Sequence, residues 1–318
     1  AKRHCRKRKS LRGIKFYNGK FNSMKHTFLL FLFLLGIAEI SNSQVNPFVA
    51  KAAELCEEKK FDEALAQIDE GFKSANLNAD PNAWYVKGYI LKELYKQKES
   101  NQRQSNYRFR SIVALKKARE FDSNMEYATN IDAALQFIAF TYFNDAILRT
   151  AEMDGESENE PLDLFKKFEE LYQGTDAELK ELKLEFNSKM AEGHYRNWIK
   201  NTEDDHHYIL CLEYYAKVLA LDNRNCTANL NLAIVNYNQG VYMIRKIGAQ
   251  TDMMDLISIQ DESVKKFKAA IPYAQQAFAS CSPSPTNYKV LMFVNRALGR
   301  EEEFLRLKKE SEKKFKIN

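Results

Sequence analysis

The fold of this chain is decided by residues 208–240, YILCLEYYAKVLALDNRNCTANLNLAIVNYNQG. Two runs of apolar residues at helical spacing meet there at a polar turn, DNRN at 222–225. Each run predicts a helix with one wide apolar face, and a lone pair of helices cannot bury two such faces. Neighbouring helices must therefore stack on this pair, which predicts a helix-turn-helix unit of a repeat array.

Weaker copies of the same pattern occur elsewhere, namely Ala64-x3-Ile68, Trp84-x2-Lys87-Gly88-x2-Leu91, Ser111-x3-Leu115 and Ala270-x3-Ala274. On these residues the chain resembles the tetratricopeptide repeat (TPR) family. The TPR unit pairs W-x2-L-G-x2-Y on one helix with A-x3-F and then Pro on the next. Lys87 and Leu91 depart from the Leu and Tyr of that motif.

The spacing also departs from the family. The small residues expected on second helices, Ala64, Ser111, Cys211 and Ala270, are 47, 100 and 59 residues apart, whereas the TPR period is about 34. Helices or turns must be longer than standard, and one more hairpin, 130–150 with 161–172, fits the longest gap. A long helix is predicted to start after Thr175, since Thr175 and Glu178 form a capping-box signature.

The sequence therefore predicts about twelve helices in six hairpins. Strand alternation is nearly absent, and 6 Pro and 11 Gly are too few for a turn-rich β fold. The expected fold class is all-α, an α-solenoid of antiparallel helical hairpins that forms a TPR-like superhelix. Residues 44–318 make up this repeat domain, with a sub-boundary near the acidic segment 154–160.

The N-terminal region predicts export. MKHT at 24–27 precedes an apolar run, FLLFLFLLGIA at 28–38, and small residues precede Gln44. Residues 24–43 thus have the order of a secretory signal peptide, cleaved after about Ser43. The run spans only about 16 Å as a helix, whereas a membrane span needs about 20 residues. A permanent anchor is the alternative.

Residues 1–23 form a basic leader with nine Lys or Arg, which we expect to be absent from the mature protein. A nucleic-acid-binding arm is the alternative. Without residues 1–43, which hold ten Lys or Arg and one Glu, the net charge falls from +5 to −4. Little electrostatic footprint for nucleic acid then remains, so we predict no nucleic-acid partner.

Four cysteines follow the leader, in no C-x-x-C spacing. Cys226 starts a predicted first helix, and Cys281 follows the second helix that packs antiparallel to it. Both then lie at one end of the hairpin, so a disulfide between them is a hypothesis. In the loop-entropy description it would contribute roughly 3–4 kcal/mol.

The segment EDDHH at 203–207 has residue types that suit a transition metal. Acidic residues at a helix start, however, also satisfy free backbone N–H groups and complement the helix dipole, and adjacent side chains diverge there. The acidic segment from Asp154 lacks the Gly and Glu of a calcium loop, with Asn159 and Phe165 at those places. We therefore predict no metal site and no cofactor.

The motifs of nucleophile elbows, phosphate-binding loops and zinc proteases are absent from the sequence. Carboxylate pairs are common by chance at 29% charged residues, so none can be assigned as an acid–base pair. We predict no catalytic residues and no enzyme activity. An all-helical hydrolase with two converging carboxylates stays open as an alternative.

In the TPR family the first helices of successive repeats usually line a concave face. The resemblance implies these partner-binding residues: Asn82, Tyr85, Tyr89, Thr227, Leu230, Ile234, Tyr237, Asn238, Lys289, Phe293 and Arg296. Aromatic rings contribute contact area at low entropic cost, and Asn can hydrogen-bond a peptide backbone. The alternative role of these residues is packing between helices.

The sequence thus predicts an exported scaffold, in the periplasm or at the surface of a bacterial cell. Its concave groove would bind a peptide or protein, with peripheral association with the cell envelope. The alternative is a glycan- or nutrient-capturing component of an outer-membrane uptake system. The 16 Tyr and 21 Phe would supply its aromatic platforms, but the apolar run has no lipid-attachment Cys close behind it.

Overall fold

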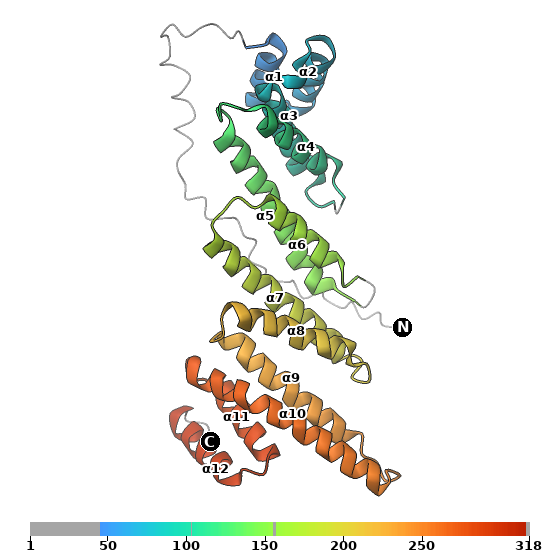
Figure 1. Ribbon diagram of the computed structural model, residues 1–318, viewed down its shortest axis with the longest axis vertical. Helices are drawn as coiled ribbons and strands as arrows, with labels where there is room; N and C mark the ends of the chain where they lie inside the picture. Colours follow the sequence, from blue (N-terminus) through green and yellow to red (C-terminus); the bar gives the residue numbers. More distant parts are fainter. Residues whose placement is uncertain (1–44, 103, 155–156, 316–318) are drawn as a thin grey trace, which may run out of the picture. The chain divides into compact units, whose positions relative to one another are not determined.

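The computed structural model describes residues 45–315 except 103, 155 and 156 (Figure 1). The predicted leader, 1–23, and the predicted signal peptide, 24–43, lie outside these residues. Within the described part there are twelve α helices and no strand. They are α1 (Pro47–Glu57), α2 (Phe61–Ser74), α3 (Pro81–Leu94), α4 (Asn106–Phe121), α5 (Ala128–Glu152), α6 (Glu160–Leu171), α7 (Asp176–Trp198), α8 (Asp205–Leu221), α9 (Cys226–Arg245), α10 (Met253–Ser280), α11 (Pro285–Ala297) and α12 (Glu301–Phe315).

Successive helices pack as antiparallel hairpins, in which α1 pairs with α2, α3 with α4, α7 with α8, α9 with α10 and α11 with α12. The rings of Phe140 on α5 and Phe168 on α6 are 6.1 Å apart, which joins the remaining pair. The predicted fold class, an all-α solenoid of antiparallel helical hairpins, is confirmed. The predicted capping box is also present, because Thr175 and Glu178 satisfy each other's backbone N–H at the start of α7.

The described residues divide into two units. The first contains residues up to 145 together with 164–173, and the second contains 146–163 and the chain from 174 onward. The division falls within α5 and α6. The acidic segment 154–160, predicted as a sub-boundary, belongs to the second unit.

In the first unit, the residues of the predicted repeat motif lie where α3 and α4 approach each other closely. A Cβ added to Gly88 would lie 2.7 Å from Cγ of Leu115, and the Ser111 hydroxyl donates to the Gly88 carbonyl at 2.7 Å. Ser111 and Leu115 are both fully buried. The motif thus has a steric reason here, since only glycine lets the two backbones come this close.

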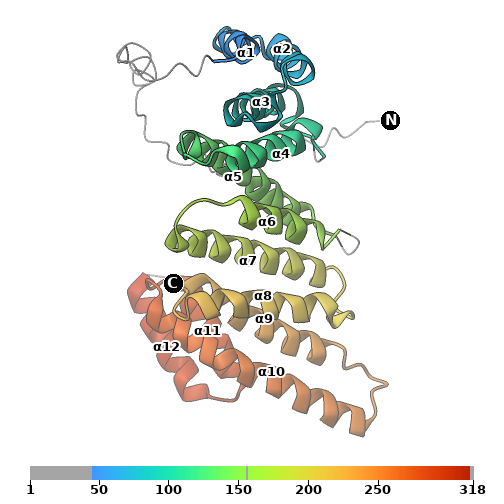
Figure 2. The same cartoon turned by 45° about the horizontal axis from the view of Figure 1, so that its top comes forward.

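In the second unit, helices α7 to α10 follow one another side by side (Figure 2). The turn at 222–225 lies where predicted, between α8 and α9. Because α8 packs chiefly on α7 and α9 chiefly on α10, this turn joins two neighbouring hairpins. The stretch 208–240 therefore holds the second helix of one hairpin and the first helix of the next.

Replacing Gly240 of α9 with alanine should destabilise the second unit by about 1–2 kcal/mol, although alanine favours helix. A Cβ at this position would lie 2.5 Å from Cε1 of Phe267, a buried ring of α10. Overpacking of this kind outweighs the propensity gain. Urea denaturation followed by circular dichroism measures the loss. Gly248→Ala is the control, because nothing lies within 4 Å of the added atom there. Equal stabilities for the two variants would contradict the prediction.

Candidate functional site

The second unit has a cavity of about 280 Å³ among α7, α8 and α9. Its lining combines aromatic, amide, charged and aliphatic side chains. The lining residues are Glu192, Tyr195 and Arg196 of α7, Tyr215 of α8, and Asn231, Ile234 and Val235 of α9. We call this the α7–α9 cavity.

Two tyrosines of the cavity are held by asparagine side chains of α9. Nδ2 of Asn231 donates to the Tyr215 hydroxyl at 2.7 Å, and Nδ2 of Asn238 donates to the Tyr195 hydroxyl at 3.0 Å. Burial raises the pKa of both phenols, so each stays protonated at neutral pH. Because each phenol oxygen accepts from asparagine, its own hydrogen is left to donate to a ligand.

The charges of the cavity differ in how they are compensated. The carboxylate of Glu192 forms an ion pair with Lys189, with 2.8 Å between Oε2 and Nζ. Nη2 of Arg196 donates to the carbonyl of Thr150 at 2.6 Å, and Arg196 forms no ion pair with any residue in the described ranges. The cavity therefore offers a guanidinium whose charge is not neutralised by a carboxylate of this part of the chain.

A larger hollow, of about 490 Å³, lies at the loop between α9 and α10. Small and aliphatic residues, such as Gly248, Ala249 and Ile259, make up much of its lining, with Lys246 and Asp255 as its charged groups. It contains no aromatic side chain. Unlike this hollow, the α7–α9 cavity combines aromatic, amide, charged and aliphatic side chains. We take the α7–α9 cavity as the candidate site.

Three of the predicted partner-binding residues lie on α3, in the first unit. Tyr85 stacks on Tyr127, with ring centroids 5.8 Å apart, and Nζ of Lys92 lies 4.3 Å from the Tyr89 ring centroid. The backbone N–H of Asn82 donates to the Asp80 carboxylate at the helix start. The rings of Tyr85 and Tyr89 thus make contacts within the first unit, and both are half-buried.

The other predicted residues lie on α9 and α11, in the second unit. Ile234 lines the cavity, and Asn238 positions Tyr195 from its edge. Tyr237 stacks on Phe293, with centroids 6.3 Å apart. The rest do not line the cavity: Leu230 is half-buried, Thr227 and Lys289 are exposed, and Arg296 lies over the ring of Phe304.

Sequence reasoning missed most of the cavity, namely Glu192, Tyr195, Arg196, Tyr215, Asn231 and Val235. The residues of α7 were overlooked because this helix matches no TPR motif, although it is a first helix by its pairing with α8. The available signal was that Tyr195 and Arg196 follow Glu192 by three and four residues, which places all three on one face of the helix.

No helix in the described part of the chain is long and apolar enough to cross a membrane. No protein-family model matches the sequence, and no curated protein matches it either. Among solved structures, the human IFIT1 dimer with PPP-AAAA is similar to this chain. The identity is 10% over 83% of this chain and 71% of that chain, with a TM-score of 0.22.

Proposed function

We propose that this chain is an exported TPR-like interaction scaffold, which binds an extended segment of a partner protein in the α7–α9 cavity. The observation that supports this most is that one cavity is lined by two tyrosine O–H donors, by a guanidinium without an ion pair among the described residues, and by apolar side chains. The apolar side chains are those of Ile234 and Val235. Enzyme activity and nucleic-acid binding are not part of the proposal. Export rests on residues 24–43 of the sequence alone.

The chemistry of the cavity favours a particular kind of segment. Tyrosine hydroxyls donate to backbone carbonyls, as expected for an extended peptide whose own backbone is unpaired. The Arg196 guanidinium matches a carboxylate in geometry and charge. We therefore expect the bound segment to carry an acidic side chain next to an apolar residue that reaches Ile234.

Arg196→Gln should weaken binding of such a segment about 10-fold or more, because a charge-assisted hydrogen bond contributes about 1.5–3 kcal/mol. Peptides are first selected on the wild-type protein from a random displayed library, and their Kd values are then measured by fluorescence anisotropy. Tyr195→Phe combined with Tyr215→Phe should lower affinity further while keeping the packing of the rings.

The matched controls are Arg245→Gln and Tyr273→Phe, which make the same chemical changes outside the cavity. Equal losses in controls and cavity variants, or no loss in either, would reject the cavity as the binding site. Selection of no peptide, together with binding on a glycan array, would favour the glycan-capturing alternative. Binding of an RNA oligomer in place of peptide would overturn the expectation of a protein partner.

A further inference from the structure

Three side chains with metal-ligating atoms meet where the segment before α6 lies against the start of α8, in the second unit. They are Glu158, His206 and His207, and one ligand atom of each lies within 4.8 Å of the other two. Nε2 of His206 is 3.2 and 3.1 Å from the two carboxylate oxygens of Glu158. Glu158 is distant in sequence, so sequence inspection of 203–207 could not reveal this set.

The carboxylates adjacent to the two histidines in sequence are occupied elsewhere. Asp204 caps α8 by accepting from the His206 backbone N–H at 2.9 Å, and Asp205 accepts from Nε2 of Gln239 at 3.0 Å. Glu203 pairs with Lys246 at 2.9 Å. These contacts leave Glu158 as the carboxylate that faces the imidazoles.

A third histidine contacts the cluster. His194 of α7 is 1% exposed, and its Nδ1 lies 3.1 Å from Nδ1 of His207. Its ring also stacks on Tyr214, with centroids 5.4 Å apart. This buried ring can hold His207 in one orientation through a single hydrogen bond, which is the role that outer partners of metal-bound histidines commonly fill.

We propose that Glu158, His206 and His207 form a binding site for a divalent transition metal of the Zn²⁺ class, with His194 as a positioning residue. Two imidazoles and a carboxylate suit Zn²⁺ and its neighbours, whereas Ca²⁺ and Mg²⁺ prefer oxygen ligands only. In tetrahedral coordination, ligand atoms about 2.0–2.1 Å from Zn²⁺ lie about 3.4 Å apart. The side chain of His206 is 53% exposed, so we expect metal binding to turn it inward by the small amount required. A bound ion would tie the segment before α6 to the start of α8 and leave one coordination position open.

The test measures Zn²⁺ binding to the full chain, first stripped with EDTA, by isothermal titration calorimetry. Co²⁺ serves as a second probe, since its visible absorption reports coordination. We expect one ion per chain, a rise in Tm with Zn²⁺, and loss of affinity of at least 10-fold in Glu158→Gln and in His206→Ala. His207→Ala should lose at least as much. These side chains are exposed or half-buried, so the metal-free variants should fold.

Glu203→Gln is the matched control, because it makes the same change in a neighbouring carboxylate that faces Lys246. His194→Leu should lower Zn²⁺ affinity about 10- to 100-fold and alter the Co²⁺ spectrum, and His194→Gln, which keeps a hydrogen-bonding group, should restore part of both. Absence of Zn²⁺ binding by the wild type would overturn the proposal. So would equal affinities in the wild type and a His206→Ala/His207→Ala variant, or equal losses in Glu158→Gln and Glu203→Gln.

Discussion

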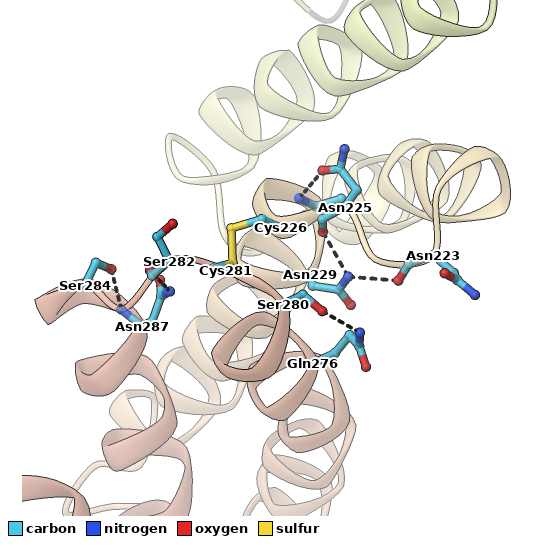
Figure 3. Close-up of a disulfide and its surroundings, with 11 residues drawn as sticks. Asn223, Asn225, Cys226, Asn229, Gln276, Ser280, Cys281, Ser282, Ser284 and Asn287 are labelled. Atoms are coloured by element: carbon cyan, nitrogen blue, oxygen red, sulfur yellow. Dashed lines mark hydrogen bonds between the residues drawn. A yellow bond between two sulfur atoms is a disulfide. The ribbon is translucent and has the colours of Figure 1, made fainter. Parts of the chain in front are cut away.

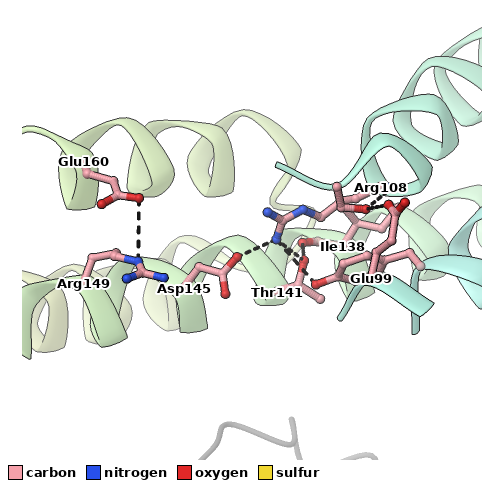
Figure 4. A network of polar contacts seen from close by, with 9 residues as sticks. Glu99, Arg108, Ile138, Thr141, Asp145, Arg149 and Glu160 are labelled. Carbon is pink, nitrogen blue, oxygen red and sulfur yellow. Dashed lines mark hydrogen bonds and ion pairs between the residues drawn. The ribbon is translucent and has the colours of Figure 1, made fainter. Parts of the chain in front are cut away.

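Arg108→Met is expected to destabilise the first unit by about 3 kcal/mol, because it removes a buried charge from a network built around it. Arg108 lies in the first turn of α4 and is 1% exposed. Its Nη1 donates to Asp145 at 2.7 Å and to the hydroxyl of Thr141 at 3.3 Å (Figure 4). The guanidinium also lies 4.0 Å from the ring centroid of Tyr142.

Charge and shape both contribute to this network. Burial lowers the pKa of Arg108, but the hydrogen bond to Asp145 and the electrostatic interactions with Tyr95, Asp145 and Tyr142 together outweigh it, so the pKa lies above its ordinary value. Methionine keeps most of the volume of the side chain, so the loss reports mainly on the hydrogen bonds and on the Asp145 carboxylate left without its partner. Since Asp145 is 28% exposed and water can solvate it in part, the loss should fall at the lower end of the range for buried pairs.

Urea denaturation measures this change as the free energy of unfolding in the transition of the first unit. Arg110→Met is the matched control on the same helix, because Arg110 is 37% exposed and lies as far as 3.9 Å from its partner Asp69. Loss of this weak ion pair should change the free energy of unfolding by about 0.5 kcal/mol or less. Arg108→Lys should recover only part of the loss, since lysine cannot stack its charge on Tyr142 as a planar group. A loss in Arg108→Met no larger than in Arg110→Met would refute the role of the network.

The architecture could be predicted from sequence because its signals are local. The apolar spacing around 208–240 and the capping box at Thr175 each act within a few residues, and the structure has helices where these signals indicate them. The small residues Ala64, Ser111, Cys211 and Ala270 are all fully buried. Close helix packing requires a small side chain at a fixed place, so this feature survives even where the repeat length varies.

The candidate sites could not be predicted in the same way, because they join residues far apart in the chain. The amide of Asn238 on α9 reaches Tyr195 on α7, and the imidazole of His206 meets Glu158. Which face of α7 borders α9 depends on how two hairpins stack, and no periodicity encodes that stacking. Aromatic residues of α9 and α11 were predicted as binding residues, yet the pair Tyr237 and Phe293 is partly occupied in contacts with each other.

The disulfide between Cys226 and Cys281 joins the start of α9 to the residue that follows α10 (Figure 3). The hairpin geometry inferred from sequence, with both cysteines at one end, is the geometry present in the structure. Local hydrogen bonds hold both segments in place. Asn225 caps α9 by accepting from the Ala228 N–H at 3.0 Å, and Nδ2 of Asn287 donates to the Ser282 carbonyl at 3.2 Å.

Cys226→Ser combined with Cys281→Ser should lower the stability of the second unit by about 3–4 kcal/mol. The cross-link closes a loop with a sequence separation of 55, and its removal returns that loop's entropy to the unfolded chain. Denaturation of the oxidised wild type, the reduced wild type and the double variant measures this loss of stability, and the reduced wild type and the double variant should agree.

Cys56→Ser is the control. Burial raises the pKa of Cys56 and of Cys211 to about 12, so both thiols stay protonated and should not exchange with the disulfide. If reduction leaves the transition unchanged, the cross-link does not stabilise the hairpin, and the packing of α9 on α10 is sufficient to hold it.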